Sequence, residues 1–150
     1  GARHDDEIVY LERTSSGRAL VRVVYLVGGR APLHLTSLGK LFLATDGPQK
    51  VREYAKRTGL PGKTPRSLTT LAALEKELDK VRRHGIAYDD EEAELGLKCV
   101  AAPIHDDEGN IVAALSVSAP ADRHAPDWAL QVRNTADAVS HALGYTGLRK

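Results

Sequence analysis

The sequence predicts an α+β domain in which helices flank one antiparallel sheet. Two groups of strand-like segments, each joined by a short polar stretch, stand near the two ends of the chain, and helical segments lie between and after them. Hairpins impose antiparallel pairing, whereas a parallel sheet would alternate single strands with helices. The 150 residues show neither an internal repeat nor a linker, so we expect a single domain over residues 1–150.

A first hairpin is expected at residues 7–13 and 19–27. Both segments are rich in Val, Ile, Tyr and Leu, which favour strands, and the polar residues 14–18 between them include a glycine. Turn residues between two apolar runs are typical of a hairpin connection.

Capping residues mark the central helices. Thr36 or Ser37 can accept the first free amides of a helix over residues 38–44. Gly47 with Pro48 then ends this helix and begins the next, because proline fits the first helical turn.

Two later helices are predicted from apolar residues at spacings of three and four. One follows Thr69 or Thr70, ends at Gly85, and has the stripe Leu71, Leu74, Leu78 and Val81. The other is expected over residues 127–143, with the stripe Trp128, Val132, Ala136, Val139 and Leu143.

Three strands are expected at residues 86–89, 97–104 and 111–118, the last two joined by a turn at residues 105–110. If this turn is symmetric about Asp107 and Glu108, the cross-strand pairs are Ile104 with Ile111, Cys99 with Ser116 and Leu97 with Ser118.

The two faces of this terminal hairpin differ in chemistry. The apolar face is assigned to the core and carries Val100, Ala102, Ile104, Ile111, Leu115 and Val117. The other face mixes small side chains with hydroxyls and a thiol, namely Leu97, Cys99, Ala101, Ala114, Ser116 and Ser118. Such a face can leave room for a ligand. Equally, it can let a helix or another subunit pack closely, and the pattern does not separate the two.

Composition excludes several classes of function. Lys and Arg number 21 against 20 Asp and Glu, a balance that gives no basic surface for nucleic acid. A single cysteine rules out an internal disulfide, and the six histidines show no metal-ligand spacing. Glycine-rich phosphate loops are absent, so no cofactor and no metal are expected. No signal segment or membrane span is evident, and we expect a cytoplasmic protein with no membrane partner.

Cys99, the acidic run at residues 89–92 and His34 could each have a functional or a structural role. A catalytic thiolate at Cys99 needs a base and a positive environment, which its neighbours do not supply, so a buried structural cysteine is favoured over a thiol enzyme using Cys99. Residues 89–92 are most simply a solvated acidic loop from which only Asp89 turns inward. His34 is expected to be a structural histidine.

Four stretches resemble the effector-binding domain of the IclR family of bacterial transcription regulators. They are PLHLTSLGKLFLA at 32–44, GIAYDDEE at 85–92, LGLKCVAAPI at 95–104 and AALSVS at 113–118. The resemblance extends from residue 5 to about residue 143. It implies a GAF-like or PAS-like sheet with flanking helices that senses a small metabolite and is not an enzyme. It also implies a winged helix-turn-helix that this sequence lacks, so DNA would be contacted only through that separate N-terminal domain.

The resemblance also implies site residues and partners. The effector pocket would be lined by Asp89, Leu97, Cys99, Ser116 and Ser118, closed by Ser37, Leu38 and Gly39, and approached by Leu20 and Val23. Because family regulators bind DNA as multimers, a homodimer or homotetramer is expected. Family domains have a helix and a strand before the segment matching residues 5–13, so the chain is expected to begin inside the domain.

The start of the first helix suggests the chemical class of the ligand. The amides of Leu38, Gly39 and Lys40 would lack acceptors and carry the positive end of the helix dipole, which favours an anion. Hydroxyls on the facing strands can hold an oxo or hydroxyl group. We therefore expect a small organic acid of this kind, or a modest aromatic acid if Leu38 moves aside.

Overall fold

The computed structural model describes residues 1–15 and 26–147, and over these ranges the chain is an α+β fold with two antiparallel sheets. The first sheet has the order β1 (Ala2–His4), β2 (Glu7–Val9) and β3 (Arg30–Pro32). The second has the order β4 (Ala87–Asp90), β5 (Leu97–His105) and β6 (Ile111–Pro120). Gly1 joins them, because its carbonyl accepts from the Ala114 amide at 2.9 Å and its amino group donates to the Ala114 carbonyl at 3.0 Å.

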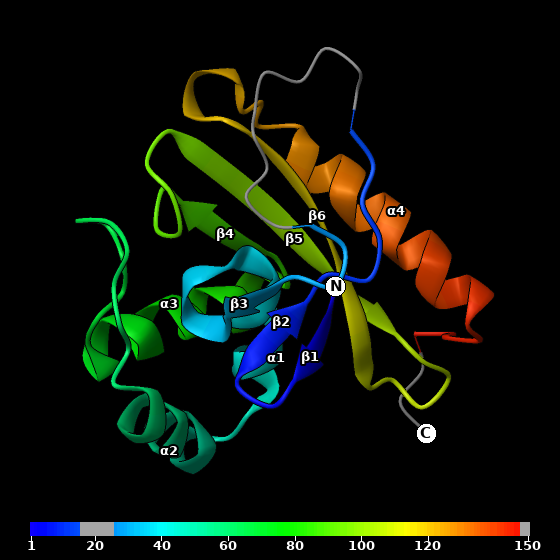
Figure 1. The fold of residues 1–150 in the computed structure, drawn as a ribbon. Helices are drawn as coiled ribbons and strands as arrows, with labels where there is room; N and C mark the ends of the chain where they lie inside the picture. The colour runs from blue at the N-terminus through cyan, green and yellow to red at the C-terminus, as the bar shows by residue number, and fades with distance from the viewer. Residues whose placement is uncertain (16–25, 148–150) are drawn as a thin grey trace.

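Four α-helices are present in the described ranges: α1 (Ser37–Thr45), α2 (Pro48–Thr58), α3 (Leu71–His84) and α4 (Trp128–Ala142). Two short 3-10 turns, Leu33–Leu35 and Ala121–Arg123, precede α1 and α4. Helix α4 lies along one face of the second sheet, while α1 to α3 and the first sheet lie on the other side (Figure 1). The predicted helix starts are confirmed, with Thr36 capping α1, Pro48 opening α2 and Thr70 capping α3.

Two apolar clusters fill the two sides of the second sheet. The larger cluster joins Leu41 of α1, Leu74 and Leu78 of α3 and Ala101 of β5. The smaller lies under α4 and includes Val100, Ala102, Ile104, Val132 and Ala136. The sheet is therefore the middle layer of the fold.

The prediction for the first hairpin was wrong in its extent. Strand β2 stops at Val9, residues 10–15 form no strand, and the partners of β2 are β1 and β3. The second expected strand falls mainly on residues 16–25, which lie outside the described residues. Strands of three residues are too short to produce an alternating apolar pattern, which explains why β1 and β3 were missed.

The predicted register of β5 and β6 was also wrong. Cys99 pairs with Ser118 and Ala101 with Ser116, while Leu97 pairs with Pro120. The turn is a three-residue type in which Gly109 takes a φ of 83° and donates to the Asp106 carbonyl. This turn shifts the register by one residue from the predicted one, and a bulge between Ile104 and His105 shifts it by one more. A total shift of two residues keeps Cys99, Ser116 and Ser118 on the predicted face, since side chains alternate with a period of two.

Helix α4 buries a slightly different stripe from the predicted one. Val132 and Ala136 are buried with Ser140, whereas Val139 and Leu143 are 40% and 50% exposed. Ser140 takes the sheet-facing position because its hydroxyl donates to the Ala136 carbonyl and accepts from the His105 amide.

Candidate ligand-binding site

The first turn of α1 forms one wall of a cavity. The Thr36 hydroxyl accepts from the Gly39 amide at 3.0 Å, and the Thr36 carbonyl accepts from the Lys40 amide at 3.1 Å. The expectation that the Gly39 and Lys40 amides are free was therefore wrong, because the cap residue takes both. Among the described residues, the amides of Ser37 and Leu38 have no such acceptor, as expected for the first two positions of a helix.

Opposite this turn lies the mixed face of the second sheet, and the space between them is a cavity of about 40 Å³. It brings together seven of the predicted residues: Ser37, Leu38, Asp89, Leu97, Cys99, Ser116 and Ser118. Tyr10, Thr36 and Ala93 also line it. That the face borders a cavity favours the ligand interpretation over close packing.

Of the three remaining predicted residues, one lies away from the cavity and two are outside the described ranges. Gly39 lies against Leu33, where a Cβ would overlap the Leu33 backbone, so its role is to let α1 approach the preceding turn. Leu20 and Val23 fall outside the described residues. Sequence reasoning missed Tyr10 because it falls in the expected strand 7–13, distant in sequence from the terminal hairpin, and Ala93 because it carries no chemical signal.

Asp89 is the most unusual residue in the wall of the cavity. Its side chain is only 2% exposed, and Oδ1 accepts from the Glu92 amide at 2.8 Å and the Ala93 amide at 3.3 Å. Burial raises the pKa of Asp89 to about 6, against the opposing effect of these amides. The cavity thus contains a carboxyl group that can change charge near neutral pH.

Cys99 pairs with Asp89 across β4 and β5 and accepts a hydrogen bond at Sγ from the Ser118 hydroxyl at 3.0 Å. Burial, followed by the negative charge of Asp89, raises the pKa of Cys99 to about 12. A catalytic cysteine requires the opposite shift, since the thiolate is the nucleophile.

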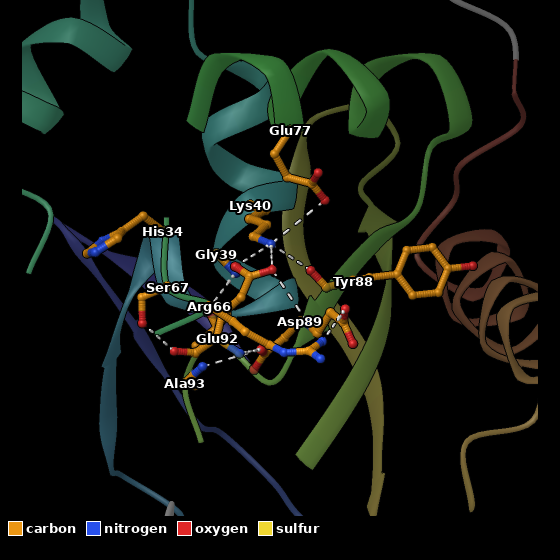
Figure 2. Close-up of polar contacts among 12 residues, drawn as sticks. His34, Gly39, Lys40, Arg66, Ser67, Glu77, Tyr88, Asp89, Glu92 and Ala93 are labelled. Atoms are coloured by element: carbon orange, nitrogen blue, oxygen red, sulfur yellow. Dashed lines mark hydrogen bonds and ion pairs between the residues drawn. The ribbon is translucent and has the colours of Figure 1, made fainter. Parts of the chain in front are cut away.

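Between α1 and the end of β4, Lys40 forms a buried ion pair with Glu92 (Figure 2). Lys40 is 0% exposed, and Nζ donates to Glu92 Oε1 and to the Tyr88 carbonyl, both at 2.7 Å. Glu77 of α3 approaches Nζ to 3.8 Å. The prediction that only Asp89 of the acidic run turns inward was therefore wrong, because Glu92 folds back to meet a lysine that had no sequence signal.

His34 is buried and saturated with hydrogen bonds. Nδ1 lies 2.7 Å from the Tyr54 hydroxyl and Nε2 lies 3.0 Å from the Pro61 carbonyl. Burial lowers the pKa of His34, and a neutral ring that donates from Nε2 to the carbonyl fits both contacts. The histidine ties α2 and the following loop to the turn before α1, as its structural interpretation predicts.

Residues 1–15 and 26–147 hold no group of three or more His, Cys, Asp or Glu side chains arranged for a metal ion. None of the described helices is long and apolar enough to span a membrane.

Comparison with known proteins identifies the fold and the family. Residues 1–141 match the family described as the C-terminal domain of the bacterial transcriptional regulator IclR. The HTH-type transcriptional repressor AllR of Klebsiella pneumoniae is 37% identical over 131 residues, which are 85% of this chain and 48% of that protein. The chain therefore spans about half the length of the curated relatives it matches.

Solved structures agree with this match. The crystal structure of the transcriptional regulator YaiJ superimposes with a TM-score of 0.90 at 30% identity, over 97% of this chain and 83% of that one. An IclR homologue from Microbacterium hydrocarbonoxydans, solved in complex with 4-hydroxybenzoate, gives a TM-score of 0.86 at 29% identity, over 95% of this chain and 58% of that one. This chain belongs to the IclR family of bacterial transcriptional regulators, of which it is the C-terminal effector-binding domain.

Proposed function

We propose that the cavity between the start of α1 and the mixed face of β4 to β6 is the effector site, and that its ligand is a small carboxylic acid with an oxo or hydroxyl group. The observation that carries this proposal is the meeting of two free helix amides with a thiol and two serines around one cavity.

The carboxylate is placed at the start of α1. The amides of Ser37 and Leu38 point out of a nine-residue helix whose dipole puts partial positive charge at this end. Ser116 and Ser118 then face the rest of the ligand with hydroxyls that can donate or accept. The 4-hydroxybenzoate in the Microbacterium homologue supports this class, since it combines a carboxylate with a hydroxyl.

The size of the cavity favours a ligand with few heavy atoms. Its volume of about 40 Å³ is a few times the roughly 10–15 Å³ that one water requires. Leu38 is 2% exposed and contributes to the wall, so an aromatic acid requires this side chain to move.

We infer that the domain senses its ligand and does not transform it. The relatives matched over this region are transcriptional repressors, and a buried Cys99 with a raised pKa is a poor nucleophile. The alternative, a thiol enzyme using Cys99, predicts rapid labelling by iodoacetamide at neutral pH. We expect labelling slower than that of free cysteine, and fast labelling would favour the enzyme.

For the whole regulator, we propose a cytoplasmic homodimer or homotetramer that contacts DNA through a separate N-terminal domain. Ligand binding in the cavity would then shift the arrangement of the DNA-binding domains. Light scattering should give a dimer or tetramer at tens of micromolar, whereas a monomer in the presence and absence of ligand would count against this assembly.

Calorimetric titration tests the ligand class directly. A thermal-shift screen of 2-oxo, 2-hydroxy and hydroxybenzoic acids supplies a hit, which is then compared with its methyl ester and its amide. Loss of the carboxylate should weaken binding by about 1.5–3 kcal/mol, the range for a charge-assisted hydrogen bond. Equal affinities for acid and ester would show that the start of α1 does not hold a carboxylate.

A further inference from the structure

Asp89 is a buried carboxyl group that touches no cation. Its Oδ1 is occupied by the amides of Glu92 and Ala93, and none of the ion pairs among the described residues includes it. The nearby ammonium group of Lys40 is directed to Glu92 and to the Tyr88 carbonyl. The other donor to the Asp89 carboxyl group is the weak thiol of Cys99, and Oδ2 accepts from no amide or cation among the described residues.

The groups around Asp89 act on its charge in opposite directions. Lys40 of α1 favours the ionised form, while Glu92 disfavours it. Cys99 of β5 is neutral at physiological pH, and Tyr10 of the segment after β2 lines the same cavity. Burial is the largest effect and brings the pKa of Asp89 to about 6, so the free protein is mostly ionised there at neutral pH.

A carboxylate ligand changes this balance. Two ionised carboxylates in one cavity of about 40 Å³ repel each other, and neither is neutralised by a contacting cation among the described residues. The group with the higher pKa then takes up the proton, as in other close pairs of acids. For simple 2-oxo or hydroxybenzoic acids, with pKa values of about 2 to 5, that group is Asp89.

We propose that Asp89 takes up one proton from solvent when the acid binds, and that the resulting Oδ2–H donates a hydrogen bond to an oxygen of the ligand. This inference rests on the proposed function. Asp89 then selects ligands that have an acceptor oxygen in addition to the carboxylate. Oδ2 is the atom that gains the proton, because Oδ1 already accepts from two amides.

The sign of the pH dependence follows from this step. Below about pH 6 the free protein already holds the proton, so the affinity is flat. Above about pH 6 the proton must be taken from solvent, and the affinity falls by up to tenfold per pH unit. Between about pH 6 and pH 8, we expect a loss of tenfold to 50-fold.

Isothermal titration calorimetry of the chain tests the proposal with pyruvate, lactate and 4-hydroxybenzoate as probes. At about pH 7, binding enthalpies in phosphate and in Tris give the number of protons exchanged, and we expect uptake of close to one proton per ligand. This measurement needs no variant. Binding of an acid with no proton uptake, and with equal affinity at about pH 6 and pH 8, overturns the proposal.

Two variants separate charge from structure. Asp89→Asn keeps an acceptor for both amides and is permanently neutral, so it should bind with no proton uptake and no pH slope. At about pH 8 its affinity should exceed that of the unaltered chain by at least tenfold. Asp90→Asn makes the same change at the neighbouring exposed carboxylate, which pairs with Lys98 at 2.8 Å, and should keep the original slope.

The outcomes distinguish this inference from the proposed function. If no probe binds to the unaltered chain or to Asp89→Asn at about 10 mM, the acid class itself is wrong and the inference falls with it. If a probe binds with the same pH slope in Asp89→Asn as in the unaltered chain, the proton belongs to another group, and the role of Asp89 alone is overturned.

Discussion

Two buried carboxyl groups, Asp89 and Glu92, stand three residues apart at the end of β4 and face different surroundings. Glu92 points to the side of α1 and α3, where Lys40 neutralises it. Asp89 points to the cavity, where two amides hold one oxygen and no cation touches it among the described residues. Burial is common to both, so burial alone does not mark a binding residue. The missing charge partner, beside empty space, is what distinguishes Asp89.

The Lys40–Glu92 pair has a structural task of its own. In residues 1–15 and 26–147, β4 is an edge strand of the second sheet, and its outer backbone groups pair with no strand of these ranges. The Lys40 ammonium donates to the Tyr88 carbonyl at 2.7 Å, while Glu92 Oε1 accepts from the Asp90 amide at 3.5 Å. Two side chains thus substitute for a further strand, since buried backbone groups need partners.

The largest effect should come from breaking this pair. Lys40→Met leaves the Glu92 carboxylate buried without its cation, and we expect a loss of about 3–5 kcal/mol in the free energy of unfolding. Urea denaturation measures it. Adding Glu92→Gln should recover part of the loss, because the uncompensated charge is then removed.

A matched control lies at the same strand. Lys98 pairs with exposed Asp90 at 2.8 Å, so Lys98→Met should cost only about 0–1 kcal/mol. Equal losses in the free energy of unfolding for Lys40→Met and Lys98→Met would show that the buried pair stabilises the fold no more than the exposed pair does.

Asp89 should give an effect of the opposite sign. Its folded-state pKa of about 6 lies above the unfolded value, so the folded state binds the proton more tightly. This group therefore favours folding below about pH 4, and that stability is lost as the pH rises to about 6. At about pH 7.5, Asp89→Asn should be more stable than the unaltered chain by up to about 3 kcal/mol. Near pH 4 the two should converge, and a gap that is the same at both pH values would contradict a raised pKa.

The same contrast shows what the sequence could predict. Cys99, Ser116 and Ser118 were placed on one face because strand alternation is local, and the two-residue error in register preserved that face. Asp89 was expected only to turn inward, and family resemblance put it in the pocket. The helix caps at Thr36 and Thr70 were equally local. Family resemblance then added Ser37 and Leu38 from the opposite wall.

Long-range pairing was beyond such reasoning. Lys40 and Glu92 are 52 positions apart, and each reads as an ordinary charged residue in its own segment. Their burial depends on how α1 packs against β4, which neither periodicity nor composition contains. The bulge next to His105 is likewise decided by packing of the hairpin, because its sequence resembles a regular strand.

The smallest predicted effects concern the two serines of the cavity. Ser118 is exposed and Ser116 half-buried, and hydroxyls placed this way contribute little to packing. Ser116→Ala and Ser118→Ala should each weaken binding of the acid by about 0.5–1.5 kcal/mol, while unfolding by urea changes little.

Ser140→Ala is the control on the other side of the sheet. That serine is buried, donates to the Ala136 carbonyl and accepts from the His105 amide. Its loss should reduce stability by about 1–3 kcal/mol, because the half-buried His105 amide is left without this partner, and should leave affinity unchanged. If the cavity serines behave like Ser140, with lower stability and equal affinity, they belong to the scaffold and the ligand contacts lie elsewhere on the wall.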